Sequence, residues 1–220
     1  MTLTPGAWFH GNLYPRRCDV SPDGRLFGYF ALKKGKAYFA VSRTPWLEAL
    51  ALWETLGTWT WGCRFSGSGD FEIRACMYEP FQPASYPGGS VSIGPMSTDW
   101  PRRDIWNELK RGWEIATENA PGLELRREQP GGTGVRLGLL HRGEGVQLEY
   151  YLQDGTDDLT PLPDAVWADW DRQGRLLMAT REGKLEVSRC EGTSLVQVWT
   201  EDLRGLKPDP QPAPGWASRW

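Results

Sequence analysis

The sequence predicts an all-β fold, and three observations support that prediction. The chain of 220 residues contains 26 Gly, 17 Pro and 13 Trp, which is typical of many short strands joined by tight turns. Segments of alternating polar and apolar residues recur along it, as expected for strands with one buried face. The turn glycines Gly24, Gly69, Gly134 and Gly174 lie 45, 65 and 40 residues apart. Because repeats of about 40–45 residues with three or four strands are typical of propeller blades, we expect a small β-propeller of four blades, or of five if the longest gap hides one.

The first and last repeats are the clearest. In segments 17–32 and 169–180 a strand runs into a polar turn that ends in Gly-Arg-Leu. A further strand follows each segment, at 36–43 and at 184–189, and both of these strands end in Val-Ser-Arg. Glycine supplies the backbone conformation that such a tight turn requires. We therefore expect a three-stranded antiparallel meander near each end of the chain.

Two weaker copies lie between these repeats. Strands 59–65 and 70–77 flank a Ser/Gly turn, and strands 123–128 and 135–141 flank a glycine-rich turn, with strand 146–152 next along the chain. These copies also predict antiparallel meanders.

A fourth, innermost strand of a blade is expected at 47–53, 113–116 or 194–199. An open ring of blades leaves unpaired strand edges, so the two ends of the chain have to meet. We expect 194–199 to pair beside residues 14–20 and to close the ring.

The longest gap between repeats runs from residue 78 to residue 121. It opens with a Pro/Gly-rich stretch, contains a short strand-like segment at 91–93, and has one or two helical turns at 104–112 with Asp104 as N-cap. We favour an inter-blade insertion at 79–113 over a hidden blade. The domain organisation is therefore a single propeller over 1–206, followed by an extended Pro-rich tail at 207–220.

The turn Ser-Pro-Asp-Gly-Arg-Leu at 21–26 and the Gly-Arg-Leu and Gly-Lys-Leu-Glu-Val segments within 166–190 resemble WD40-like and TolB-like β-propeller repeats. The run 40–53 also resembles one in bacterial propeller-like proteins of unassigned activity. The resemblance covers about two thirds of the chain, and the Gly-His and Trp-Asp dipeptides of WD40 repeats are missing. It implies a fold and no activity.

Composition excludes several classes of protein. With 25 Lys+Arg against 28 Asp+Glu, the net charge of −3 argues against a nucleic-acid binder and against a polybasic membrane-surface protein. The N-terminus has no signal-peptide pattern, and the densest apolar stretch, 45–53, is far shorter than the roughly 20 residues that span a bilayer. We expect a cytoplasmic protein. Its four cysteines form no Cys-x-x-Cys pair and are expected to be reduced thiols in strands: Cys18, Cys63, Cys76 and Cys190.

No pattern of catalytic or metal-binding residues stands out. His10 and His141 are the only histidines, and no Gly-x-Ser-x-Gly motif occurs. The acidic loop 154–158 lacks the spacing of a calcium loop, and the glycine-rich turn 130–134 lacks the Lys-Ser/Thr of a phosphate-binding loop. We expect no catalytic set, no metal and no cofactor.

Clusters of arginine and aromatic residues are the strongest functional signal, because this composition is typical of protein interfaces. The expected alternative is that these arginines stack or pair within the fold. The insertion is the better candidate, since a propeller does not need it. The candidate partner-binding residues are Trp100, Arg102, Arg103, Trp106, Tyr14, Arg16, Trp216 and Trp220.

The first functional hypothesis is therefore a non-enzymatic module that binds another protein, as a scaffold, an accessory or inhibitory subunit, or a component of a hetero-complex. The alternative is a propeller enzyme, or a binder of small ligands or glycans, that uses carboxylates at the central channel. The candidate carboxylates are Asp19, Asp70, Asp169 and Asp171.

Overall fold

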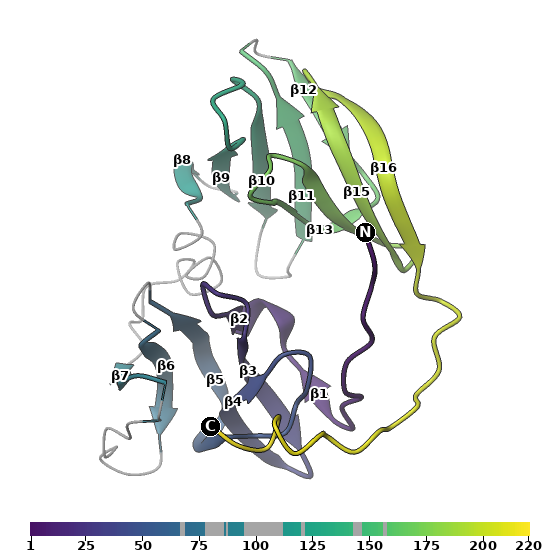
Figure 1. Ribbon diagram of the computed structural model, residues 1–220. Helices are drawn as coiled ribbons and strands as arrows, with labels where there is room; N and C mark the ends of the chain where they lie inside the picture. Colours follow the sequence, from purple (N-terminus) through teal and green to yellow (C-terminus); the bar gives the residue numbers. More distant parts are fainter. Residues whose placement is uncertain are drawn as a thin grey trace. The chain divides into compact units, whose positions relative to one another are not determined.

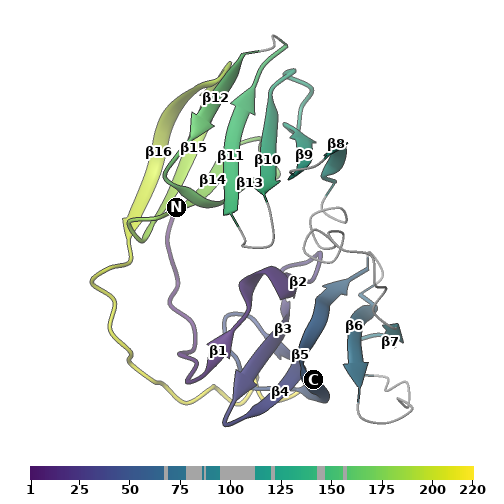
Figure 2. The same ribbon diagram turned by 180° about the vertical axis from the view of Figure 1, so that it is seen from behind.

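The regular structure of the chain is almost entirely β (Figures 1 and 2). The computed structural model describes residues 1–66, 69–77, 86, 88–94, 112–119, 122–142, 147–155 and 158–220. Within these ranges, the one helical element is a 3₁₀ turn, η1 (Pro15–Arg17). In the same ranges no helix is long and apolar enough to cross a membrane. The all-β prediction is confirmed, whereas the expected helical turns at 104–112 lie outside the described residues except for Gly112.

Contacts between residues divide the chain into two compact units. Thr4–Asn107 together with Pro208–Trp220 form one, which we call the N-unit, and Met1–Leu3 together with Glu108–Lys207 form the other, the C-unit. The tail from Pro208 onward thus belongs to the same unit as residues 4–107.

A seven-stranded sheet forms the N-unit, in the order β1-β3-β4-β5-β6-β7 with β2 paired to β3. Neighbouring strands are antiparallel except β6 and β7, which are parallel. The strands are β1 (Asn12–Leu13), β2 (Asp19–Val20), β3 (Leu26–Lys33), β4 (Lys36–Arg43), β5 (Ala51–Phe65), β6 (Phe71–Met77) and β7 (Val91–Gly94).

Strand β5 belongs to both halves of this sheet. Its residues 51–54 pair with β4, and its residues 55–65 pair with β6 after two shifts of register. Gly57, between the two halves, has a φ of 113°, which residues with a side chain rarely adopt. The expected separate strands at 47–53 and 59–65 are therefore wrong, because β5 runs continuously through the irregularity.

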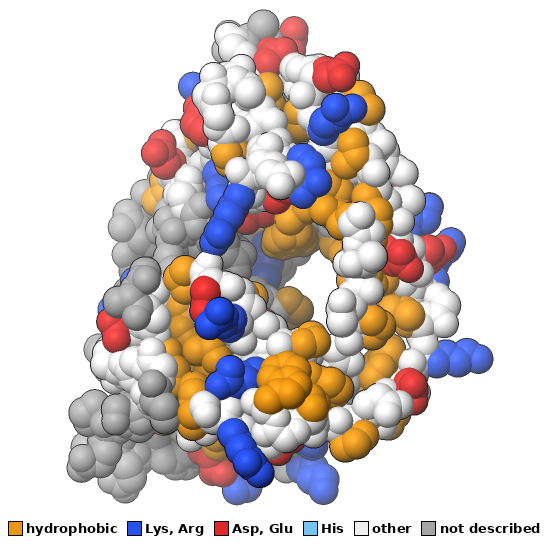
Figure 3. Space-filling view, in the orientation of Figure 1, with side chains coloured by type: hydrophobic (Ala, Val, Ile, Leu, Met, Phe, Trp, Pro, Cys, Tyr) orange, Lys and Arg blue, Asp and Glu red, His pale blue; other side chains and the backbone are white. Residues whose placement is uncertain are grey.

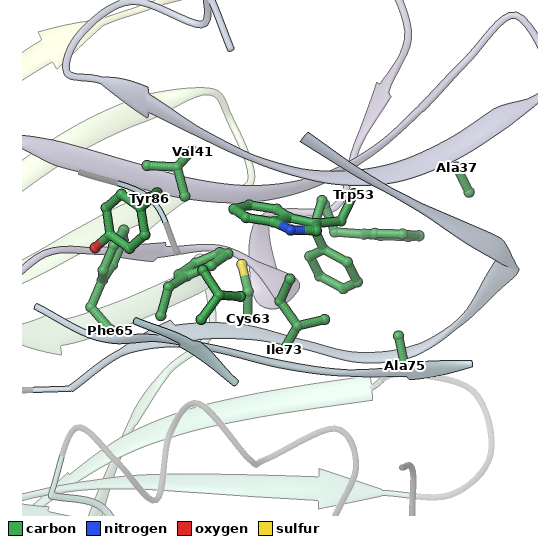
Figure 4. Packing of buried hydrophobic residues seen from close by; sticks show 12 residues of the cluster. Ala37, Val41, Trp53, Cys63, Phe65, Ile73, Ala75 and Tyr86 are labelled. Atoms are coloured by element: carbon green, nitrogen blue, oxygen red, sulfur yellow. The ribbon is translucent and has the colours of Figure 1, made fainter. Parts of the chain in front are cut away.

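The bent sheet encloses the main core of the N-unit. Figure 4 shows Val41 and Trp53 pointing into the same space as Cys63 and Ile73. Aromatic rings fill much of it: Phe71 lies with its centroid 5.6 Å from that of Trp53 and 4.9 Å from that of Phe65. Complete burial of one such side chain contributes about 1.5–3 kcal/mol, so this cluster is a major source of the unit's stability.

Two antiparallel meanders form the C-unit. One sheet has the order β12-β11-β10-β9-β8 and the other the order β13-β14-β15-β16. The strands of the first are β8 (Glu114–Asn119), β9 (Gly122–Glu128), β10 (Arg136–Arg142), β11 (Gln147–Gln153) and β12 (Leu159–Leu162). The strands of the second are β13 (Ala165–Trp170), β14 (Leu176–Thr180), β15 (Lys184–Glu191) and β16 (Ser194–Asp202).

The two sheets of the C-unit are joined by polar contacts between β9 and the β13–β14 hairpin. The Arg127 guanidinium donates to the Asp169 carboxylate, and the Trp170 indole N–H donates to the Arg127 carbonyl over 3.1 Å. The Gln129 side-chain amide donates to the Gly174 carbonyl over 2.5 Å. These bonds satisfy polar groups that would be costly to bury unpaired.

The local meanders are confirmed, and the ring closure is wrong. The β2–β3 and β13–β14 hairpins turn at Gly24 and Gly174, with φ of 76° and 73°. Strand β16, expected to pair beside residues 14–20, pairs with β15 along its whole length. The short turn at Gly192 places these two strands side by side, and this local pairing costs less chain entropy than a long-range one. The described strands form three open sheets, which fit the all-β class.

Candidate binding site

The predicted partner-binding residues lie in different environments. Trp100, Arg102, Arg103 and Trp106 lie outside the described residues. Tyr14 packs on the main core of the N-unit, with its ring centroid 5.1 Å from that of Phe30. The guanidinium of Arg17 lies 5.1 Å from the centroid of the Tyr14 ring, and it also donates to the Thr58 carbonyl over 2.6 Å. Tyr14 is thus half-buried in the fold, and Arg16 is partly buried in η1.

The tail that carries Trp216 and Trp220 is docked on the N-unit. Figures 1 and 2 both show it ending beside β4 and β5. Ala217 is completely buried, and Arg43 Nε donates to the Arg219 carbonyl over 2.8 Å. The Trp220 ring packs on Tyr86 with 5.0 Å between centroids, whereas Trp216 is more than half exposed. The tail is therefore part of the folded unit, and Trp216 is its most exposed aromatic side chain.

A pocket of about 270 Å³ lies on the N-unit. It is bordered by the N-terminal segment, the strands β3, β4 and β5, the loop before β5, and the tail. Five aromatic side chains dominate its lining, so we call it the aromatic pocket: Trp8, Phe9, Tyr29, Tyr38 and Trp46. Its remaining lining residues include three with ionisable side chains, His10, Lys33 and Glu48.

Strand pairing and two anchoring bonds assemble the pocket. Tyr29 pairs with Ala40, and Tyr38 pairs with Ala31, so the two tyrosines lie diagonally on the face of the sheet opposite Phe30. The Tyr29 hydroxyl donates to the Leu47 carbonyl over 2.9 Å, which holds the loop before β5 against the sheet. The Ala7 N–H donates to the Pro45 carbonyl over 3.0 Å and fixes the N-terminal segment on the same loop.

Burial determines the protonation state of the two pocket tyrosines, Tyr29 and Tyr38. Burial raises the pKa of both tyrosines, and at Tyr29 the neighbouring Tyr38 and Cys18 raise it further. Both hydroxyls are therefore neutral near pH 7 and act as hydrogen-bond donors. Lys33 Nζ lies 5.6 Å from the centroid of the Phe9 ring, a cation–π contact. Flat aromatic faces with a few polar groups at the rim suit an extended, weakly charged ligand.

The four candidate carboxylates are each held by their own unit. Asp19 accepts from the Phe65 N–H over 2.8 Å, and Asp70 accepts from the Ser90 N–H over 3.0 Å. In the C-unit, Asp169 accepts from Arg127 and from the Trp170 N–H. Local structure, rather than a shared ligand, thus accounts for the contacts of these three.

Asp171 closes the β13–β14 turn. Burial acts to raise the pKa of its carboxyl group, but hydrogen bonds from the backbone and side chain of Arg175 outweigh burial and lower it. Among the described residues, no three His, Cys, Asp or Glu side chains gather closely enough to hold a metal ion. Cys18, Cys63 and Cys190 are reduced thiols, and those of Cys18 and Cys63 donate to the Tyr14 and Arg17 carbonyls.

Sequence reasoning missed the aromatic pocket because segments far apart in the sequence build it. Its signal in the sequence is indirect: 27–32 and 37–41 are apolar on both alternating faces, which indicates strands covered on both sides. The main core covers one face, and Phe9 and Leu47 help to cover the other.

Comparison with known proteins places this chain in no group: no family model, no curated protein and no solved structure matches it significantly.

Proposed function

We propose that this chain is a non-enzymatic protein-interaction module, and that its binding surface is on the N-unit. The observation that carries the proposal is the exposure of large apolar side chains on β5. Leu52 and Leu56 lie on the same face of this strand and are about half exposed, and Trp59 is 68% exposed. Leu52 also lines the aromatic pocket, so this exposed face of β5 continues the pocket. Exposed apolar and aromatic groups of this kind mark sites where proteins associate.

The space-filling view supports a surface for association. In Figure 3, hydrophobic side chains reach the surface in several groups, separated by charged residues of both signs. A partner that covers the pocket and β5 would bury the apolar side chains of Leu52 and Leu56 together with Glu54, which lies between them on the same face and accepts from Lys36 Nζ over 2.9 Å.

The propeller-type repeat also stays part of this proposal. The β13–β16 meander has the strand order of one blade, and Asp19 and Asp169 stand five residues before equivalent turn glycines. Both features support a common repeat for segments 17–43 and 166–190. We also keep the proposal of a cytoplasmic location, which the reduced thiols support because that compartment is reducing.

The experiment is a co-purification from the native host with the tagged full chain and two variants. The first variant is Leu52→Asp with Leu56→Asp, and the matched control is Leu159→Asp, a similarly exposed leucine on β12 of the C-unit. We expect wild type and the control to retain the same partner, and the double variant to lose at least about tenfold of it, because charge at a buried interface centre is costly. Equal retention by all three proteins, or no retained protein with any of them, would contradict the proposal.

A further inference from the structure

The tail has its backbone conformation dictated by its sequence. From Lys207 to Pro214 the chain reads Lys-Pro-Asp-Pro-Gln-Pro-Ala-Pro, so every residue is either a proline or stands directly before one. Proline fixes φ near −65°, and the residue before it is excluded from the helical region. An extended, polyproline II-like segment of about 20 Å is the result. The structure agrees, since residues 206–214 contain no helix, strand or turn.

This extended segment already borders the aromatic pocket. Gln211 and Ala213 line the pocket together with Trp8 and Trp46. Beyond the prolines, the buried Ala217 and the bond from Arg43 to Arg219 hold the end of the tail on the N-unit. The pocket therefore has a proline-rich segment seated at it.

The pocket also has the chemistry that proline-rich segments need. Proline rings pack on flat aromatic faces, and a preformed extended chain loses little entropy on binding. The backbone carbonyls of an extended proline-rich chain need hydrogen-bond donors. The Tyr29 hydroxyl already donates to the Leu47 carbonyl. The pocket also contains Trp8 and Trp46, whose indole N–H groups are hydrogen-bond donors.

We propose that the aromatic pocket is a docking site for extended proline-rich segments. Residues 208–214 are its resident ligand, and a proline-rich segment of a partner protein competes with them. This inference rests on the proposed function as a protein-interaction module, for which it names the class of partner. Residues 208–212 are exposed, so the resident segment is held mainly by its anchored end and can be displaced.

The test uses a fluorescent peptide with the sequence of residues 207–214 and the full chain, with binding measured by anisotropy. The key variant replaces Pro208, Pro210, Pro212 and Pro214 by Gly, which removes the preformed conformation of the resident segment. If the tail segment 208–214 occupies the pocket nine-tenths of the time, the apparent affinity of the pocket for the added peptide falls about tenfold. We therefore expect the variant to bind the peptide about tenfold more tightly than wild type does.

Two further substitutions on this background locate the binding. Trp8→Ala removes an aromatic wall of the pocket and should weaken binding at least about tenfold, because aromatic residues dominate such interfaces. Trp167→Ala removes a tryptophan of similar exposure to Trp8 that lies on β13 of the C-unit and does not line the pocket, and binding should be unchanged.

A measurement on wild type keeps the proposal testable if the glycine variant does not fold. Prolines have no N–H, so the amide NMR signals of Asp209, Gln211 and Ala213 report on the resident segment. Excess peptide should move the Gln211 and Ala213 signals toward positions typical of an unfolded chain.

Three results would overturn the proposal. They are equal loss of binding with Trp8→Ala and Trp167→Ala, equal binding of a control peptide with alanine at every proline, and binding of an oligosaccharide in place of the peptide. Failure here is distinct from failure of the proposed function. If the co-purified partner depends on Leu52 and Leu56 but not on Trp8, the chain is an interaction module whose partner does not use this pocket.

Discussion

Two buried aspartates, one in each unit, have the same structural role: each connects a hairpin to a neighbouring strand. Asp19 and Asp169 each stand directly before a hairpin turn, five residues ahead of Gly24 and Gly174. Asp19 bonds to the backbone of β5, and Asp169 bonds to the side chain of Arg127 on β9. An aspartate at this point of the repeat thus ties its hairpin to a neighbouring strand. The sequence repeat predicted the hairpins, but it gave no reason to expect a structural role for these two carboxylates, which were candidates for catalysis.

At Asp171 we predict a pH-dependent loss of stability on substitution by Asn. The carboxylate accepts from the N–H groups of Gln173 and Arg175 and from Arg175 Nε over 2.6 Å, and hydrogen bonds to a charged group contribute about 1.5–3 kcal/mol each. Its folded pKa is lowered, so the contribution is complete above the ordinary pKa of 3.8 and is lost as the pH falls toward the folded value.

Urea unfolding of wild type and Asp171→Asn at several pH values measures this effect. The variant should be less stable by about 1–3 kcal/mol at pH 7, and the difference should shrink below about pH 4. A difference independent of pH would mean that the charge of Asp171 does not stabilise the turn.

At Gly138 we predict that even a methyl group is too large. A Cβ at this position would overlap the Tyr151 ring, which lies directly opposite across the β10–β11 pair. Gly138→Ala should therefore destabilise the C-unit by about 1–3 kcal/mol, the usual cost of overpacking. Gly155→Ala is the control, because a Cβ there meets no atom within 4 Å. Equal midpoints of the two variants in urea would refute the prediction.

At the scale of elements, local patterns predicted hairpins well and longer pairings poorly. The β3–β4 and β14–β15 pairs follow from apolar segments joined by short polar turns, since both signals lie within a few residues. The continuity of β5 does not follow from such a pattern, because it depends on two partners, β4 and β6, that occupy different parts of the strand. The aromatic pocket was missed for the same reason, as its walls come from segments far apart in the sequence.

Strand β16 offers a test of its position at the edge of its sheet. In the described part of the chain β16 pairs only with β15, and Val196 and Val198 are largely exposed. Val196→Lys with Val198→Lys should leave thermal stability within about 0.5 kcal/mol and reduce aggregation on heating, because lysine protects sheet edges. Val187→Lys on β15, which buries the charge, should unfold the sheet. Strong destabilisation by the double variant would show that another surface covers β16.

At the scale of the whole molecule, the all-β class could be predicted from the sequence, whereas the way in which the sheets are arranged could not. A recurring meander is common to propeller blades and to open antiparallel sheets, and the choice between them depends on contacts between repeats. The spacing of 45, 65 and 40 residues is irregular, whereas equal blades require similar lengths, so the number of blades and their closure stay predictions.

Because the chain divides into two compact units, we predict two transitions in calorimetry. Trp220→Ala removes the packing on Tyr86 and should lower only the transition of the N-unit, by an amount equivalent to about 0.5–1.5 kcal/mol. Gly138→Ala should lower only the other transition. A shift of about 4–8 °C per kcal/mol is expected for units of this size, so the effects are resolvable. A single transition that both variants shift equally would contradict this division.

The division of the chain has a consequence for its genetic dissection. Residues 208–220 fold with 4–107, although residues 108–207 of the C-unit lie between them in the sequence. A fragment that stops at residue 107 therefore lacks the buried Ala217 and the partner of Arg43. To isolate the N-unit in a complete form, residues 208–220 have to be rejoined to 4–107 by a new linker, which amounts to excising the C-unit as an inserted domain.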